Sequence, residues 1–113
     1  IKKIKLGNIS VLRDWGWAPE YVVAMQMIAD SNDIKDHVIC SGNSNTLERF
    51  IEKVFQLCEL NWKDHIDIDQ NLFRPYDIKQ SYGDPKPLYE DLGWKAEEDF
   101  DSIINKLISF AKK

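Results

Sequence analysis

The 113-residue sequence lacks several features that often reveal a function directly. It contains no GxGxxG or Walker-type glycine-rich loop, so it has no phosphate-binding loop of its own. It has no excess of basic residues, because 15 lysines and arginines face 19 acidic residues, and the net charge of −4 argues against nucleic-acid binding. No apolar run approaches the roughly 18 residues of a membrane span, and no signal-peptide pattern is present. We therefore expect a cytoplasmic protein with no nucleic-acid or membrane partner.

Cysteine is also scarce, since only Cys40 and Cys58 are present and they do not form a CxxC pair. Both lie in apolar surroundings, where a free cysteine behaves as a small hydrophobic residue. We therefore expect both thiols to be reduced, buried and inert, with no disulfide or zinc site.

What is present is enough apolar material for one packed domain, with 43% hydrophobic and 12% aromatic residues. Alternation of apolar and polar residues predicts short strands. The expected strands cover residues 2–6, 37–40 and 65–69, and the last of them has Ile66 and Ile68 facing inward. A further short strand is expected somewhere in residues 74–85.

Apolar residues spaced three and four apart predict four helices. The first begins near Pro19 and buries Tyr21, Met25 and Ile28. The other three are expected over residues 47–58 with Thr46 or Asn45 as the cap, over 85–93 with Asp84 as the cap and Gly93 at the end, and from the acidic segment 97–101 to 112–113.

The expected order of elements is β-α-β-α-β-(β)-α-α, a small α/β fold with few short strands and about four helices. So small a sheet cannot cover all the apolar helix surface. Part of that surface is expected to pack on a partner domain outside this chain, and the start at Ile1 rather than methionine also indicates a piece of a longer protein.

Two patterns resemble catalytic or metal sites but are better explained structurally. Tyr82 and Lys86 match Tyr-x-x-x-Lys, which needs both residues on one helix, and Pro85 prevents a continuous helix there. His65 shares one strand face with two aspartates, which is the ordinary pattern of a solvated strand face. No catalytic residue and no metal ligand is therefore assigned to this chain.

Two arginines are the best candidates for binding. Arg13 lies between a strand and a helix, where α/β proteins concentrate binding residues. Arg74 precedes a proline, which keeps its backbone extended. Guanidinium groups suit bidentate binding of a diphosphate, and Asp77 can accept hydrogen bonds from ribose hydroxyls. Surface ion pairing is the alternative for either arginine.

Three segments of the chain point to one enzyme family by their order and spacing. The first contains LGN, RDWG and YVVAM, the second is SGNSNTLERFIEKVF, and the third runs from Trp62 to Trp94 and contains FRPYD and LGW. Together they resemble the GDP-mannose 4,6-dehydratase family over nearly the whole chain, from about Lys5 to Phe110.

The resemblance implies that residues 1–113 are the C-terminal nucleotide-sugar-binding domain of an extended short-chain dehydrogenase/reductase whose Rossmann half is missing. The family oxidises C4 of the hexose of GDP-mannose, eliminates water across C5 and C6, and returns the hydride to C6. NADP and the catalytic residues belong to the missing half. This chain alone is therefore expected to be inactive and to bind no cofactor, whereas the full-length protein is expected to be a homo-oligomer.

The resemblance also implies roles for four residues. Arg13 and Arg74 match the family arginines that contact the nucleotide, with Arg13 on the diphosphate. Asp77 stands where the family usually has glutamate for the ribose, and Asn8 matches the LGN asparagine at the edge of the pocket. Trp17 replaces the usual histidine, and its role stays open.

Two alternatives remain at the level of sequence. One is the C-terminal domain of an epimerase or dehydratase that acts on another nucleotide sugar. The other is a free-standing binding module without catalytic activity.

Overall fold

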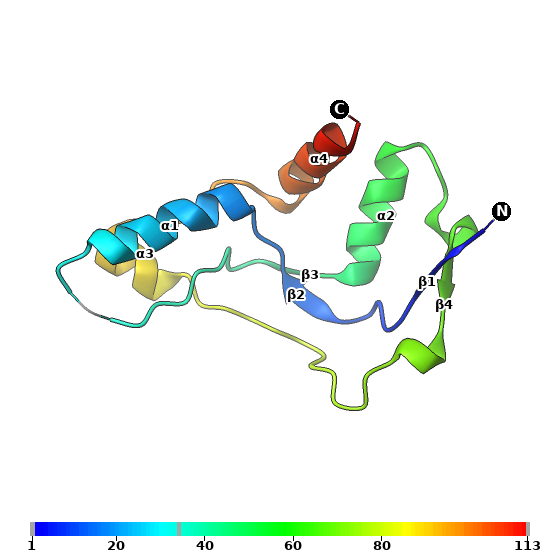
Figure 1. Ribbon diagram of the computed structural model, residues 1–113, viewed down its shortest axis with the longest axis horizontal. Coiled ribbons are helices and arrows are strands. Elements are labelled where there is room, and N and C mark those ends of the chain that lie inside the picture. Colours follow the sequence, from blue (N-terminus) through cyan, green and yellow to red (C-terminus); the bar gives the residue numbers. More distant parts are fainter. Residues whose placement is uncertain (1, 34, 113) are drawn as a thin grey trace.

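The computed structural model describes residues 2–33 and 35–112, which form an elongated, flattened body measuring 55 × 37 × 18 Å. Figure 1 shows a pair of helices at one end of this body, a pair of strands at the other, and two further helices and extended chain between them. The strands are β1 (Ile4–Leu6), β2 (Leu12–Asp14), β3 (Ser44–Thr46) and β4 (Ile66–Ile68). The helices are α1 (Ala18–Asp30), α2 (Leu47–Leu57), α3 (Lys86–Leu92) and α4 (Phe100–Ala111), and two single 3₁₀ turns cover Trp62–Asp64 and Gln70–Leu72.

The strands form two separate two-stranded sheets. β1 and β4 run parallel, with Ile4 opposite Ile66. β2 and β3 run antiparallel, with Arg13 opposite Asn45. The other edge of β2 is also occupied, because the Leu12 N–H donates to the Lys79 carbonyl at 2.8 Å and the Leu12 carbonyl accepts from Ser81 N at 3.0 Å. β2 therefore lies between β3 and the segment that follows residue 78.

Local signals set the helix ends largely as the sequence predicts. Thr46 caps α2 by accepting a hydrogen bond from the Arg49 N–H at 3.1 Å. The residue at the N-cap of α3 is Pro85 and not Asp84 as predicted, although the Asp84 side chain accepts from the Lys86 N–H at 3.0 Å. Gly93 ends that helix with φ of 75°, a left-handed conformation that favours glycine. Asp99 caps α4.

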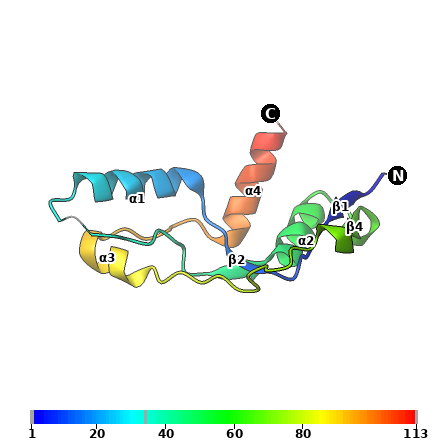
Figure 2. The ribbon, with the colours of Figure 1, turned by 60° about the horizontal axis from the view of Figure 1, so that its bottom comes forward.

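Two groups of buried residues hold the fold together. The first joins β4 to α2 and contains Ile9, Ile51 and Ile66. The second, with Ala24, Leu88 and Trp94, joins α1 to α3, which lie side by side in Figures 1 and 2. The extended strands β2 and β3 connect these two ends, and that connection is where the candidate site lies.

Several expectations about individual elements are wrong. Residues 37–40 form no strand, since a short apolar run cannot by itself specify a ladder partner and Val38 is 62% exposed. Conversely, β2 and β3 were not expected, because three-residue strands such as Ser44–Thr46 carry no alternation to detect. Cys40 is buried as predicted, but Cys58 is exposed at the end of α2.

Burial also differs in detail from the periodicity argument. Ile66 is buried, but Ile68 is 43% exposed, because only the first part of the short β4 is covered by the residues around Ile51. In α1 the buried position is Ala24, whereas Met25 is 56% exposed. No helix in residues 2–33 and 35–112 is long and apolar enough to cross a membrane.

Candidate functional site

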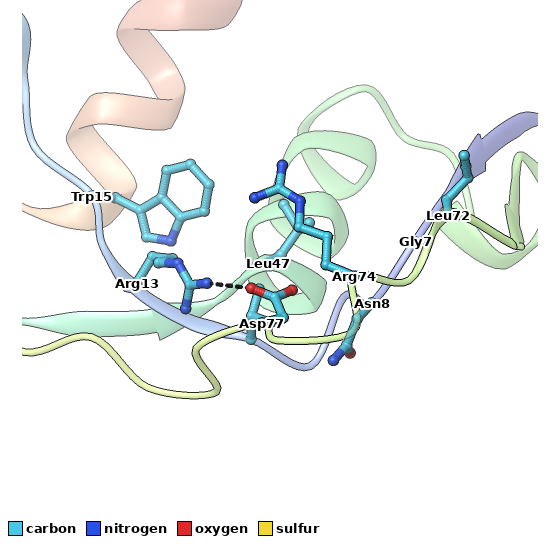
Figure 3. A pocket seen from close by; sticks show the side chains of 9 residues that line it. Gly7, Asn8, Arg13, Trp15, Leu47, Leu72, Arg74 and Asp77 are labelled. Atoms are coloured by element: carbon cyan, nitrogen blue, oxygen red, sulfur yellow. Dashed lines mark hydrogen bonds and ion pairs between the residues drawn. The ribbon is translucent and has the colours of Figure 1, made fainter. Parts of the chain in front are cut away.

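A pocket of about 290 Å³ opens beside β2, between the chain that follows β1, the start of α2 and the segment after Gln70–Leu72 (Figure 3). The four residues that the sequence singles out for binding, Asn8, Arg13, Arg74 and Asp77, all line it. They come from positions up to 69 residues apart in the chain, since 77 − 8 = 69. The remaining lining residues are Gly7, Val11, Trp15, Leu47 and Leu72.

Arg13 lies in the middle of β2 and is held by two interactions. Its Nη2 donates to Asp77 Oδ1 at 3.0 Å, forming an ion pair, and its Nη1 donates to the Leu12 carbonyl oxygen at 2.9 Å. Its side chain is 31% exposed, so this pair is partly shielded from water. A guanidinium has further N–H donors, and these remain available to an anion in the pocket.

Arg74 is positioned differently. It follows the 3₁₀ turn Gln70–Leu72, precedes Pro75 and is exposed. Its guanidinium extends into the pocket in Figure 3, and within the described residues it forms no hydrogen bond or ion pair. Its full set of donors is therefore free for a ligand.

Asp77 and Asn8 provide the other polar groups of the pocket. One oxygen of Asp77 is engaged by Arg13, and the carboxylate keeps further acceptor positions on Oδ2. The Asn8 side-chain oxygen accepts from the Ser10 N–H at 2.9 Å and from Ser10 Oγ at 2.6 Å. Its amide NH₂ group is left to interact elsewhere. The pocket therefore combines two cations, one carboxylate and one amide, a set suited to a phosphorylated, hydroxyl-rich ligand.

Trp15 is a pocket residue that sequence reasoning did not assign to the site. Its ring stacks on Phe50 of α2, with centroids 4.6 Å apart, and its Nε1 donates to the Asn45 carbonyl at 3.1 Å. Trp15 directly follows β2 in extended chain, where residues two apart point to the same side, and this explains why Arg13 and Trp15 line one pocket. The alternation of residues 13 and 15 could not assign Trp15 to the site from the sequence, because β2 itself was not expected.

The two misleading patterns lie away from this pocket. Lys86 begins α3, while Tyr82 lies before it in extended chain and is 68% exposed, so the pair does not share a helical turn. His65 stacks on Phe55, and Asp67 pairs with Lys3 at 3.7 Å. Among residues 2–33 and 35–112 there is no group of three or more side chains able to hold a metal ion.

The described residues do not fit a dinucleotide cofactor. Such a site needs a glycine-rich turn between a parallel strand and a helix, so that phosphates meet the helix N-terminus. In the parallel pair, β1 is followed by extended chain and β4 by the 3₁₀ turn Gln70–Leu72.

The fold is that of the C-terminal part of short-chain dehydrogenase/reductase proteins. RMD from Pseudomonas aeruginosa, solved in complex with NADPH, matches with a TM-score of 0.82 and 19% identity, over 95% of this chain and 35% of that one. A dTDP-glucose 4,6-dehydratase from Bacillus anthracis, in complex with NAD, matches with a TM-score of 0.85 and 14% identity, over 98% of this chain and 35% of that one. At these identities the likeness establishes the fold alone.

Sequence comparison identifies the family within this class. The family model for GDP-mannose 4,6 dehydratase matches residues 1–107, so the chain belongs to the GDP-mannose 4,6-dehydratase family and the predicted resemblance is confirmed. GDP-mannose 4,6 dehydratase 1 of Arabidopsis thaliana is 37% identical over 106 residues, covering 94% of this chain and 29% of that protein. The Homo sapiens enzyme is 28% identical over 120 residues, covering 91% of this chain and 32% of that protein. The chain thus spans about a third of the length of these relatives.

Proposed function

We propose that residues 1–113 are the nucleotide-sugar-binding domain of a GDP-mannose 4,6-dehydratase. The observation that supports this most directly is the convergence of Arg13 and Arg74 on one pocket from distant parts of the chain. Family membership supplies the ligand, because the relatives are named for GDP-mannose.

In the proposed complex, Arg13 and Arg74 bind the diphosphate of the nucleotide sugar. Two guanidinium groups match the charge and the paired oxygens of a diphosphate better than ammonium groups would. Asp77 accepts hydrogen bonds from the ribose hydroxyls through the oxygen that Arg13 leaves free. Asn8 lies at the edge of the pocket and donates through its amide.

The remaining steps of the reaction belong to other parts of the full-length protein. We propose that the parent enzyme converts GDP-mannose to GDP-4-keto-6-deoxymannose with NADP, which accepts and returns the hydride. The described residues do not form a site for that cofactor, so we assign NADP and the catalytic groups to the region outside this chain. A cytoplasmic, homo-oligomeric full-length enzyme is part of the same proposal.

Two alternatives make different predictions. A related epimerase or dehydratase would prefer a nucleotide other than GDP; one solved structural neighbour is a UDP-glucose 4-epimerase from Bifidobacterium longum in complex with NAD⁺ and UDP (TM-score 0.80, 19% identity). A non-catalytic module would bind a nucleotide sugar without converting it.

The test is calorimetric titration of the full-length protein with GDP, GDP-mannose and UDP-glucose, followed by mass spectrometry of the products. We expect binding of both guanine nucleotides, at least tenfold weaker binding of UDP-glucose, and loss of one water molecule from GDP-mannose. Arg49, exposed on α2 and outside the pocket, supplies the matched control variant Arg49→Ala, which should bind GDP like the parent protein. Preference for the uridine nucleotide would contradict the proposal, and binding without conversion would favour the module.

A further inference from the structure

Asp14 follows Arg13 in β2 but does not line the pocket, and it accepts more hydrogen bonds than any other carboxylate in residues 2–33 and 35–112. We propose that Asp14 is a positioning residue for Arg13, which fixes the strand and thereby directs the guanidinium at the diphosphate. This inference rests on the proposed function of the pocket, and it gives Asp14 a role in ligand binding without ligand contact.

The hydrogen bonds of Asp14 come from the segment that leads into β3. Its two oxygens accept from the Ser41 N–H, each at 3.1 Å, and Oδ2 accepts from the Gly42 N–H at 2.9 Å. Ser41 Oγ donates to Oδ1 at 2.8 Å. The Tyr21 hydroxyl makes a longer contact of 3.4 Å from α1. One side chain thus ties β2 both to the approach to β3 and to the first helix.

The donors to Asp14 are neutral, and no ion pair involving it is found among the described residues. Hydrogen bonds between a carboxylate and backbone N–H groups are charge-assisted and stronger than neutral ones. Breaking them would leave a partly buried carboxylate unsatisfied, which is costly. The arrangement is therefore a rigid one.

β2 needs such support because its own pairing is weak. It has three residues and its β3 partner also has three, while its other edge is held by two hydrogen bonds to Lys79 and Ser81. So short a ladder contributes little stability by itself. Successive strand residues point to opposite faces, so fixing the Asp14 side chain on one face sets the direction in which Arg13 leaves the other. Asp77 then holds the tip of the Arg13 side chain, while Asp14 holds its backbone.

Two titratable groups, Tyr21 and Cys40, lie close to Asp14. Burial, followed by the charge of Asp14, raises the pKa of Tyr21 to about 12. The same two causes, in the same order, raise the pKa of the Cys40 thiol. Both groups therefore stay neutral near pH 7 and add no further negative charge behind Arg13.

The test is a double-mutant cycle in the full-length protein with Asp14→Asn and Arg13→Ala, reading GDP affinity by calorimetry. Asparagine has nearly the same shape, but whichever way its amide turns, an NH₂ group faces an N–H donor of Ser41 or Gly42. We expect Asp14→Asn alone to weaken GDP binding about tenfold, because a small misplacement of a binding group is costly. In the Arg13→Ala background the same change should alter affinity less than about twofold.

The possible outcomes separate this inference from the proposed function. If Asp14→Asn binds GDP like the parent protein while Arg13→Ala binds it poorly, the positioning role of Asp14 is overturned and the proposed binding site stands. If Asp14→Asn weakens GDP binding equally with and without Arg13, the substitution has a general structural effect, and the positioning role is also overturned. Arg13→Ala binding like the parent protein contradicts the proposed function itself.

Folding is checked for every variant by circular dichroism, with Asp101→Asn on the exposed side of α4 as the matched control. If Asp14→Asn does not fold, Ser41→Ala replaces it in the cycle. It keeps the Ser41 N–H bonds to Asp14 and removes the 2.8 Å bond from Ser41 Oγ, together with the two hydrogen bonds between Ser41 Oγ and the Asn43 backbone. The expected loss of affinity is then about threefold, again only when Arg13 is present. An unchanged affinity overturns the proposal.

Discussion

Arg13 and Arg74 line the same pocket, but the structure supports them in opposite ways. Arg13 lies in a strand that is paired on both edges, and its guanidinium already bonds to Asp77 and to a backbone carbonyl. Arg74 lies in exposed chain, with Pro75 beside it and no polar partner within the described residues. In the proposed complex, one cation is ordered before the ligand arrives, whereas the other becomes ordered on binding.

This difference has an energetic consequence. Ordering a free arginine side chain costs about 1.5–2 kcal/mol of conformational entropy, which is subtracted from whatever Arg74 gains from the ligand. Arg13 has already met this cost in the folded protein. It also neutralises Asp77, whose carboxylate would otherwise repel a diphosphate.

The largest expected effect is therefore that of removing Arg13. In the full-length protein, Arg13→Ala should weaken GDP binding about a hundredfold. Two charge-assisted hydrogen bonds to the diphosphate are lost, and Asp77 is left unpaired. Arg74→Ala should weaken it about tenfold, since the entropy cost disappears together with the contacts. Calorimetry against the Arg49→Ala control measures both; equal losses would remove the distinction between the two arginines.

Lysine substitutions give a smaller effect that sharpens the same comparison. Arg13→Lys should stay close to Arg13→Ala in GDP affinity, because one ammonium group cannot reproduce the planar fork that meets both Asp77 and the Leu12 carbonyl. Arg74→Lys should retain binding within about threefold of the parent protein, because Arg74 has no fixed geometry to lose. The same calorimetric series measures both, and recovery by Arg13→Lys would show that charge alone matters there.

The smallest expected effect concerns pH and the support behind Arg13. The pKa of Tyr21 is raised to about 12 by burial first, then by the charge of Asp14, with Cys40 and Glu20 contributing. Between pH 10 and 12 the unfolded chain releases this proton while the folded chain keeps it. The stability from neutral Tyr21 is thus fully present below about pH 10 and is lost as the pH rises toward 12.

Denaturant unfolding of the full-length protein between pH 9 and 12 measures this effect. The slope due to Tyr21 should be well under the one-proton limit of about 1.4 kcal/mol per pH unit, because the side chain is only partly buried. Tyr21→Phe should flatten the pH dependence. The matched control is Tyr76→Phe, since Tyr76 is 97% exposed and should change nothing. The same slope in both variants would exclude Tyr21 as its source.

The sequence alone determined the four helices, the Thr46 cap of α2, the end of α3 at Gly93 and the candidate binding residues. Thr46, Gly93 and the apolar spacing of α2 act within a few residues, so they can be recognised without a fold. Arg13 and Arg74 were recognisable because the phrases around them, RDWG and FRPYD, resemble those of a known family, which the family match confirms. Their roles in binding stay predictions.

Only the tertiary structure decided how these parts meet. β2 exists because residues 12–14 pair with residues 44–46 on one edge and 79–81 on the other, contacts between segments about thirty or more residues apart that no local pattern encodes. That pairing turns Arg13 and Trp15 into the pocket and Asp14 out of it, because successive strand residues face opposite sides. The exposure of Cys58 and Met25 is likewise decided by tertiary contacts. Burial depends on which neighbours the fold brings to a side chain, and the periodicity of a single helix does not contain that information.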